Sequence, residues 1–374
     1  MEDINAWQFG LVIVAGYLGA GIFQFPRELV DFAGPDALWA YLLLAAFFLG
    51  LFWLYLNVAD INPDRSFGSV LQSLLTPFVG WPIQAVRIGI HWILAMFVLA
   101  NFGQVMHTFF LPSTPAWAVE SALAGTAIYM VWFGTATFAR TLETILLPTA
   151  LGSILIGLLV TPRMREIWAV LPVGHLAVGP ILAGAYHSAY IFVGFETLGQ
   201  VYGHVRVDAR KAAKRNAYIV FAISVFLYGY GYAVTLGNEG PSALSRMQWP
   251  PVSALRLANL HGFFISKLGL LVDVLWGLLA LAFVGARYWC VAQNLAENPH
   301  RELKVGRYHL MLVLAGATSV VGAQPLGNAN RLVHLFQTMG LPFMMVYLTV
   351  VPVTILSVHY LTRWRRSQKA QSSG

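Results

Sequence analysis

Apolar side chains fill the chain in long runs that polar residues interrupt only briefly. Ten of these runs have about the length of helix, roughly 20 residues, that crosses the hydrocarbon core of a bilayer. They predict helices over residues 7–30, 36–58, 83–111, 115–137, 143–161, 179–203, 216–237, 266–297, 308–323 and 334–361. Proline, glycine and charged residues mark most junctions, as in Asn62–Arg65 and Pro112–Pro115. The pattern therefore predicts an all-α polytopic membrane protein.

The predicted helices divide into two sets of five. No composition shift or low-complexity linker separates the sets, so we expect a single transmembrane domain over residues 1–374. Repeat one would cover about 7–161 and repeat two about 179–361. Because five is odd, the two halves would insert with opposite topology, as inverted repeats do.

Composition and charge agree with a membrane protein. The chain is 58% hydrophobic and 10% charged, whereas soluble domains have roughly 25% charged residues. The basic residues behind the net charge of +7 lie in short loops, which argues against a nucleic-acid partner. When successive loops are assigned to alternate sides of the membrane, fifteen Lys and Arg residues, including Arg87, fall on the side of the chain ends and seven fall on the opposite side. This asymmetry predicts that both termini are cytoplasmic.

Two predicted helices are interrupted at a similar depth. The first contains Gly19 and Gly21, and the sixth contains Gly194 followed by Glu196. An unwound segment in a bilayer survives only where protein, water or a ligand binds the freed backbone groups. Broken helices in corresponding positions of inverted repeats commonly hold a substrate at the midplane. The alternative is close helix packing, which glycine often serves in membranes.

From these breaks we expect a small zwitterion to bind between helices one and six. Half-helix N-termini would face its anionic group and half-helix C-termini its ammonium group. The expected ligand-binding residues are Gly19, Ala20, Gly21, Phe23, Phe192, Gly194, Phe195 and Glu196. We expect Glu196 either to orient the ligand ammonium or to fix the break.

Several segments resemble a known family. The glycine pair with Pro26, together with Gly194–Glu196, is similar to the amino acid–polyamine–organocation superfamily. The match narrows to the spore germination receptor B-subunit family, the endospore germination permeases, which three segments resemble: Phe110–Trp117, Ala139–Pro148, and Leu171–Val173 followed by Gly179–Leu182. The resemblance covers nearly the whole chain. It implies a sensor in the spore inner membrane that binds a nutrient, usually an amino acid, and acts with A and C subunits.

Other polar residues fall inside predicted helices, where a charge costs about 2.5–3.5 kcal/mol on insertion scales. Asn101, Gln104 and His107 form a stripe that could line a polar pathway or make interhelical hydrogen bonds. Arg140 and Glu143 are three residues apart and predict a structural ion pair. We expect Arg287 to reach the cytoplasmic surface along its apolar stem.

Recognisable catalytic patterns do not occur in the sequence. His91, His107 and His187 lack the spacing of a metal site, and no phosphate loop or nucleophile elbow is present. We expect no metal, no cofactor and no enzymatic activity. Residues 268–286 contain no Ser or Thr that could serve a sodium site of the kind found in sodium-coupled relatives. A transporter of amino acids or related metabolites is the main alternative to the sensor, and a passive channel or structural subunit is the third.

Overall fold

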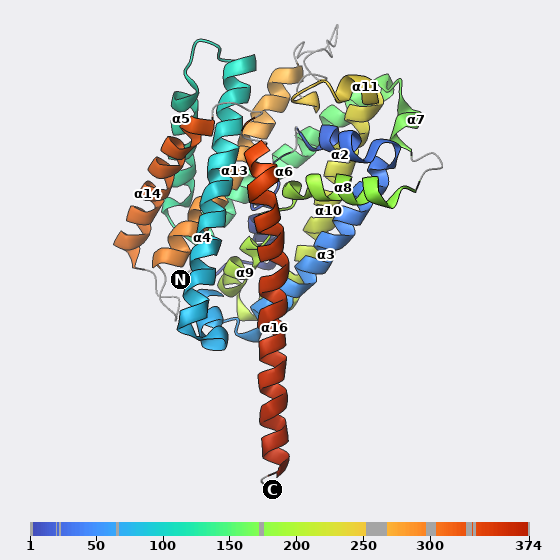
Figure 1. Cartoon of the computed structure of the whole chain (residues 1–374). Coiled ribbons are helices and arrows are strands. Elements are labelled where there is room, and N and C mark those ends of the chain that lie inside the picture. Colours follow the sequence, from blue (N-terminus) through green and yellow to red (C-terminus); the bar gives the residue numbers. More distant parts are fainter. Residues whose placement is uncertain are drawn as a thin grey trace.

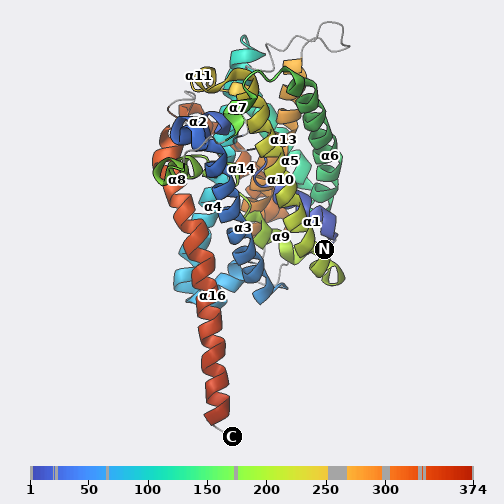
Figure 2. The same ribbon diagram turned by 90° about the vertical axis from the view of Figure 1, so that its right-hand side faces the viewer.

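The computed structural model describes residues 3–19, 21, 24–64, 67–171, 176–251, 268–296, 304–326, 331 and 334–372. These residues form a bundle of helices (Figures 1 and 2). The helices are α1 (Ala6–Ala15), α2 (Phe25–Ala33), α3 (Ala37–Ile61), α4 (Phe67–Phe109), α5 (Ala116–Trp132), α6 (Thr135–Val160), α7 (Ile167–Val170), α8 (Val178–His187), α9 (Thr197–Val201), α10 (Arg210–Glu239), α11 (Pro241–Leu244), α13 (Leu268–Ala296), α14 (Val305–Ala323) and α16 (Leu341–Ser372). A π-helical turn, Phe336–Gly340, leads into α16.

The all-α membrane architecture is confirmed. Within the described residues, seven helical stretches are long and apolar enough to cross a membrane, one of them joining α2 to α3. Three predicted spans remain. The fourth is α5, the first is divided into α1 and α2, and the sixth is divided into α8 and α9. The chain is therefore a polytopic membrane protein whose first and sixth helices are broken.

Two predicted helix starts were wrong. α4 joins two helices across a kink at Thr76, where φ is 66°, and the second of them begins at Pro77 rather than at 83. A proline is tolerated at this position because the first turn of a helix needs no backbone N–H from it. The fifth span begins at Thr135 rather than at 143, so the expected pair Arg140 and Glu143 lies inside α6.

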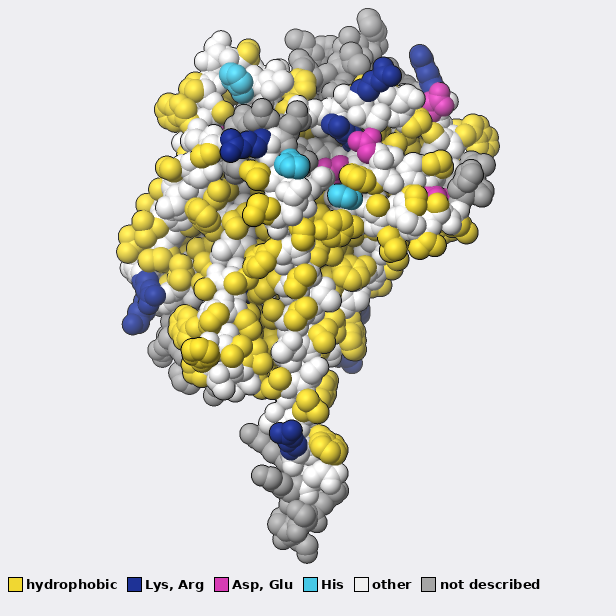
Figure 3. All heavy atoms as spheres, viewed as in Figure 1, with side chains coloured by type: hydrophobic (Ala, Val, Ile, Leu, Met, Phe, Trp, Pro, Cys, Tyr) yellow, Lys and Arg dark blue, Asp and Glu magenta, His cyan; other side chains and the backbone are white. Residues whose placement is uncertain are grey.

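The core is organised around α13, which packs against α4, α5, α6 and α14. Helix α1 packs against α10 and α6, while α3 packs against α8 and α16. Large apolar side chains remain exposed on the outside, as at Trp53 (56%) and Phe78 (89%). Figure 3 shows hydrophobic side chains covering the flank of the bundle. Such a surface is expected where lipid is the solvent.

The two chain ends lie in the same half of the molecule. In both views the N-terminus is in the lower half and α16 extends downward to the C-terminus (Figures 1 and 2). Near the N-terminus, Ile4 forms an isolated parallel bridge with Val205, which follows the sixth span. The cytoplasmic location of this end stays a prediction.

Candidate functional site

The break in the first span extends from Gly16 to Gln24, between α1 and α2. Its glycines are required by contacts with other helices. A Cβ atom on Gly19 would lie 2.8 Å from the carbonyl oxygen of Leu279 on α13, and one on Gly21 would lie 2.0 Å from the ring of Tyr190. Gly19 and Gly21 thus lie in the break as predicted. The predicted ligand contacts Ala20 and Phe23 lie outside the described residues.

The break in the sixth span lies between His187 at the end of α8 and Thr197 at the start of α9. Its chain passes through a short 3-10 turn and then Gly194, whose φ of 113° favours glycine. A Cβ atom on Gly194 would lie only 1.9 Å from the carbonyl oxygen of Gly16. The two breaks therefore meet backbone to backbone at Gly16 and Gly194.

Arg287, on α13, holds this junction together and was predicted wrongly. Its side chain is fully buried, whereas we expected it to reach the cytoplasmic surface. The Nη2 atom donates to the carbonyl oxygens of Gly16 at 2.8 Å and Gly194 at 2.9 Å, and to the hydroxyl of Thr197 at 2.5 Å. A guanidinium offers several donors in a fixed plane. One side chain therefore satisfies carbonyl groups that both breaks leave free.

Glu196 and His91 complete the same cluster. Oε2 of Glu196 accepts from the backbone N–H of Gly194 at 2.9 Å, and Oε1 accepts from Nη1 of Arg287 at 3.3 Å. Nη1 also donates to Nδ1 of His91 at 2.8 Å, so this ring nitrogen acts as an acceptor and the imidazole is neutral. Both carboxylate oxygens of Glu196 are thus engaged within the protein.

Phe192 and Phe195 are fully buried and face the bundle rather than lipid. The Phe195 ring stacks on Phe52 of α3 with centroids 5.0 Å apart. The Phe192 ring lies 5.3 Å from that of Phe221 on α10. Both rings anchor the sixth-span break between α3 and α10, and their contact with a ligand stays a prediction.

Arg87 is a second buried arginine that the sequence interpretation assigned to the cytoplasmic surface. It lies on α4 and is 1% exposed. Its Nη1 atom donates to the side chains of Gln200 and Asn294, each at 3.0 Å, and its guanidinium lies 4.3 Å from the centroid of the Phe67 ring. The missed signal was its position inside an apolar run, where a charge needs a buried partner.

The predicted polar stripe of the third span divides in two. Asn101 and Gln104 are buried in the bundle, and Oδ1 of Asn101 accepts from Gln24 at 3.3 Å and from Trp249 at 3.2 Å. His107 is instead exposed, with Nδ1 at 3.1 Å from the carbonyl oxygen of Thr114 in the following loop. The polar pathway stays a prediction.

The other predicted polar feature is the pair Arg140 and Glu143 on α6. Oε2 of Glu143 accepts from Nε2 of Gln8 at 3.2 Å, which ties α6 to α1. Arg140 also interacts within the protein. The ion pair between the two residues stays a prediction.

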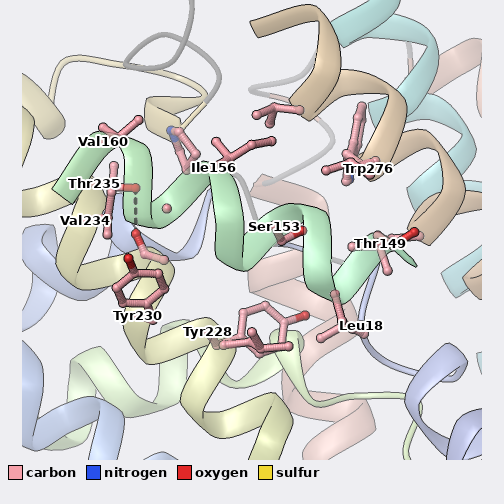
Figure 4. A pocket seen from close by; sticks show the side chains of 18 of the residues that line it. Leu18, Thr149, Ser153, Ile156, Val160, Tyr228, Tyr230, Val234, Thr235 and Trp276 are labelled. Atoms are coloured by element: carbon pink, nitrogen blue, oxygen red, sulfur yellow. Dashed lines mark hydrogen bonds between the residues drawn. The ribbon is translucent and has the colours of Figure 1, made fainter. Parts of the chain in front are cut away.

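An apolar hollow of about 140 Å³ lies between α6, α10 and α13 (Figure 4). Thr149 and Ser153 line it from α6, Tyr228 and Tyr230 from α10, and Trp276 from α13. Among the described residues around it, none is charged. The hollow therefore suits an apolar group better than a zwitterion.

A polar hollow of about 260 Å³ lies beside α2, on the other side of the first break from α1. It is lined by Gln24, Arg27, Glu28, Asp31, Phe32, Gln248, His334 and Gln337. Charged side chains and amides therefore surround a space next to a broken helix. This chemistry suits a small charged molecule.

Comparison with known sequences identifies a family. The model of a family described as spore germination protein matches residues 3–325. Spore germination protein A2 of Bacillus subtilis is 26% identical over 277 residues, which cover 73% of this chain and 74% of the relative. Spore germination protein B2 of the same organism is 22% identical over 345 residues, 90% of each chain.

Solved structures show the same fold at low sequence identity. A structure of MhsT in complex with L-phenylalanine aligns with a TM-score of 0.59 and 13% identity, over 94% of this chain and 97% of that one. A Na⁺-coupled sialic acid symporter in a substrate-bound outward-open state aligns with a TM-score of 0.61 and 13% identity, over 93% and 80%. The likeness concerns the architecture alone.

Proposed function

The chain belongs to the spore germination protein family, and from this premise we propose that it is the nutrient-sensing subunit of a spore germination receptor. Its ligand would be an amino acid or a similar small molecule, bound near the midplane between the broken first and sixth helices. The observation that supports this most is the meeting of the two breaks at Gly16 and Gly194. Broken helices in corresponding positions of inverted repeats commonly hold a substrate between them.

The proposed binding residues fall on both breaks. The first span would offer backbone groups of Gly19, Ala20 and Gly21 and the aromatic ring of Phe23. Phe192, Gly194 and Phe195 would do so from the sixth. Glu196 would act as a positioning residue, since its carboxylate engages Gly194 and Arg287.

Sensing would work through the packing of the two repeats. A ligand shifts a conformational equilibrium only by binding one state better than the other. A ligand held by both breaks would favour one relative position of the two helices, and the change would pass to A and C subunits at the surface. We place this assembly in the spore inner membrane, with both chain ends in the cytoplasm.

A binding screen tests the proposal. Purified wild-type chain and the Gly21→Leu variant are heated with each of the standard amino acids and a set of nucleosides, and the unfolding temperature is measured. We expect one ligand class to stabilise the wild type and not the variant, because a side chain at position 21 collides with Tyr190. Spores carrying Gly21→Leu should then fail to germinate with that ligand. Normal germination of such spores would contradict the proposed site.

Transport is the second candidate, since the two solved structures compared above are of proteins with a bound small molecule and one of them is named a symporter. Vesicles that contain only this chain would distinguish the two functions. Accumulation of a labelled amino acid against its gradient would favour a transporter. Binding without accumulation would favour the sensor.

A further inference from the structure

We propose that Glu28 binds the ammonium group of the ligand, and that the ligand class is small molecules with a primary ammonium group. This inference rests on the proposed function and adds a residue to it. Glu28 lies on α2, in the first turn after the first-span break, and lines the polar hollow. Glu28 takes the ammonium-binding role that the sequence suggested for Glu196, because both carboxylate oxygens of Glu196 already accept hydrogen bonds from Gly194 and Arg287.

Glu28 has one satisfied and one unsatisfied oxygen. Glu28 is only 8% exposed, and its Oε1 atom accepts a hydrogen bond from Nε2 of Gln337 at 2.7 Å. Oε2 is buried and has no hydrogen-bond partner among the described residues. A buried carboxylate oxygen without a donor is costly. An ammonium group would supply the missing donor and the opposite charge.

Tyr190 places a second buried oxygen beside it. Its hydroxyl group is close enough to Glu28 for a side-chain hydrogen bond, and it makes no hydrogen bond of good geometry with any other described residue. Tyr190 belongs to the break in the sixth span, and its ring lies directly against Gly21 in the first. An ammonium carries three N–H donors, so it can bind both oxygens at once. The two breaks would then share one ligand group.

The polar hollow explains how such a ligand reaches Glu28. Its volume of about 260 Å³ is enough for a small metabolite. Arg27 lies on the same wall, where it pairs with Asp31 at 3.1 Å. A zwitterion can therefore place its ammonium at Glu28 and its carboxylate towards Arg27. The apolar hollow beside α6 has no charged lining residue of this kind in the described chain.

The test measures the affinity of purified full-length variants by calorimetry. The probes are L-phenylalanine and L-alanine, each with its amine analogue (phenethylamine, ethylamine) and its acid analogue (3-phenylpropionate, propionate), after a first screen of all standard amino acids. Glu28→Gln keeps an oxygen for Gln337 but removes the charge, and Tyr190→Phe removes only the hydroxyl. Asp208→Asn is the control, because Asp208 is an exposed carboxylate that does not line the hollow. Unliganded unfolding temperatures confirm that each variant folds.

We expect the dissociation constant of the best amino acid to rise about tenfold to hundredfold in Glu28→Gln, as loss of one charge-assisted hydrogen bond predicts. Tyr190→Phe should raise it by a smaller factor, and Asp208→Asn should leave it within about twofold. The amine analogue should bind wild type, and the acid analogue should not.

Equal affinity of wild type and Glu28→Gln would overturn the inference while leaving the sensor proposal intact, as would tight binding of the acid analogue. Absence of binding by every amino acid and amine to the wild type would count against both the inference and the proposed function.

Discussion

Gly194 approaches Gly16 so closely that a single methyl group on Gly194 would lie 1.9 Å from the carbonyl oxygen of Gly16. The two residues are 178 positions apart in sequence and belong to the two broken helices. Their carbonyl oxygens accept from the same Nη2 atom of Arg287. One guanidinium thus joins the two breaks at the point where their backbones meet.

Replacing Gly194 by alanine should destabilise the protein strongly. The substitution combines a clash with Gly16 and a φ of 113°, which L-residues with a side chain rarely adopt. We expect a loss of about 2–6 kcal/mol, the sum of overpacking and backbone strain. Gly125→Ala is the control, because a Cβ there meets no atom within 4 Å. Thermal unfolding in detergent measures both, and an equal effect of the two variants would contradict the role of the junction.

Arg287→Met should cost about 3–5 kcal/mol, because it leaves the buried carboxylate of Glu196 without its cation. The double variant Arg287→Met/Glu196→Gln should recover part of this loss, since no uncompensated charge then remains. A double-mutant cycle from denaturation experiments gives the coupling. Strictly additive costs would show that the two side chains do not act as a pair.

Arg87→Met tests the second buried arginine. Its loss removes the donor to the buried side-chain oxygen of Gln200, and a buried acceptor that loses its donor costs about 1–3 kcal/mol, whereas the oxygen of Asn294 keeps a donor in Gln84. We therefore expect a clear drop in unfolding temperature. Arg206→Met is the matched control, because Arg206 pairs with Asp208 at the exposed surface. Similar, small effects of both changes would mean that Arg87 is solvated, as its sequence position first suggested.

Ligand affinity should not depend on sodium. Residues 268–286 of the eighth span contain no hydroxyl side chain. The carbonyl oxygen of Gly16, at the break in the first span, already accepts a hydrogen bond from the guanidinium of Arg287. Dissociation constants measured in sodium chloride and in choline chloride should agree within about twofold. Tighter binding by a factor of ten or more in sodium would reveal a cation site elsewhere.

Some predictions succeeded because they depend on local composition. Long apolar runs must become helices in a bilayer, so a polytopic all-α membrane architecture was predictable. Gly19, Gly21 and Gly194 marked the two breaks, since glycine weakens a helix wherever it stands. The starts of the helices at Pro77 and Thr135 were predicted wrongly, because each follows a residue with positive φ, Thr76 or Gly134, which hydropathy does not reveal.

The sequence by itself determined the all-α membrane class and the positions of the breaks, both of which follow from hydropathy and backbone preferences of neighbouring residues. Only the tertiary structure decided which buried charges meet. Arg287 is 271 residues from Gly16 and 91 from Glu196, and no local pattern records such contacts. The structure also left Glu28, rather than Glu196, with an oxygen free of protein hydrogen bonds in the described chain. In a low-dielectric interior, what a charged side chain can bind depends on the partners that the fold brings within reach.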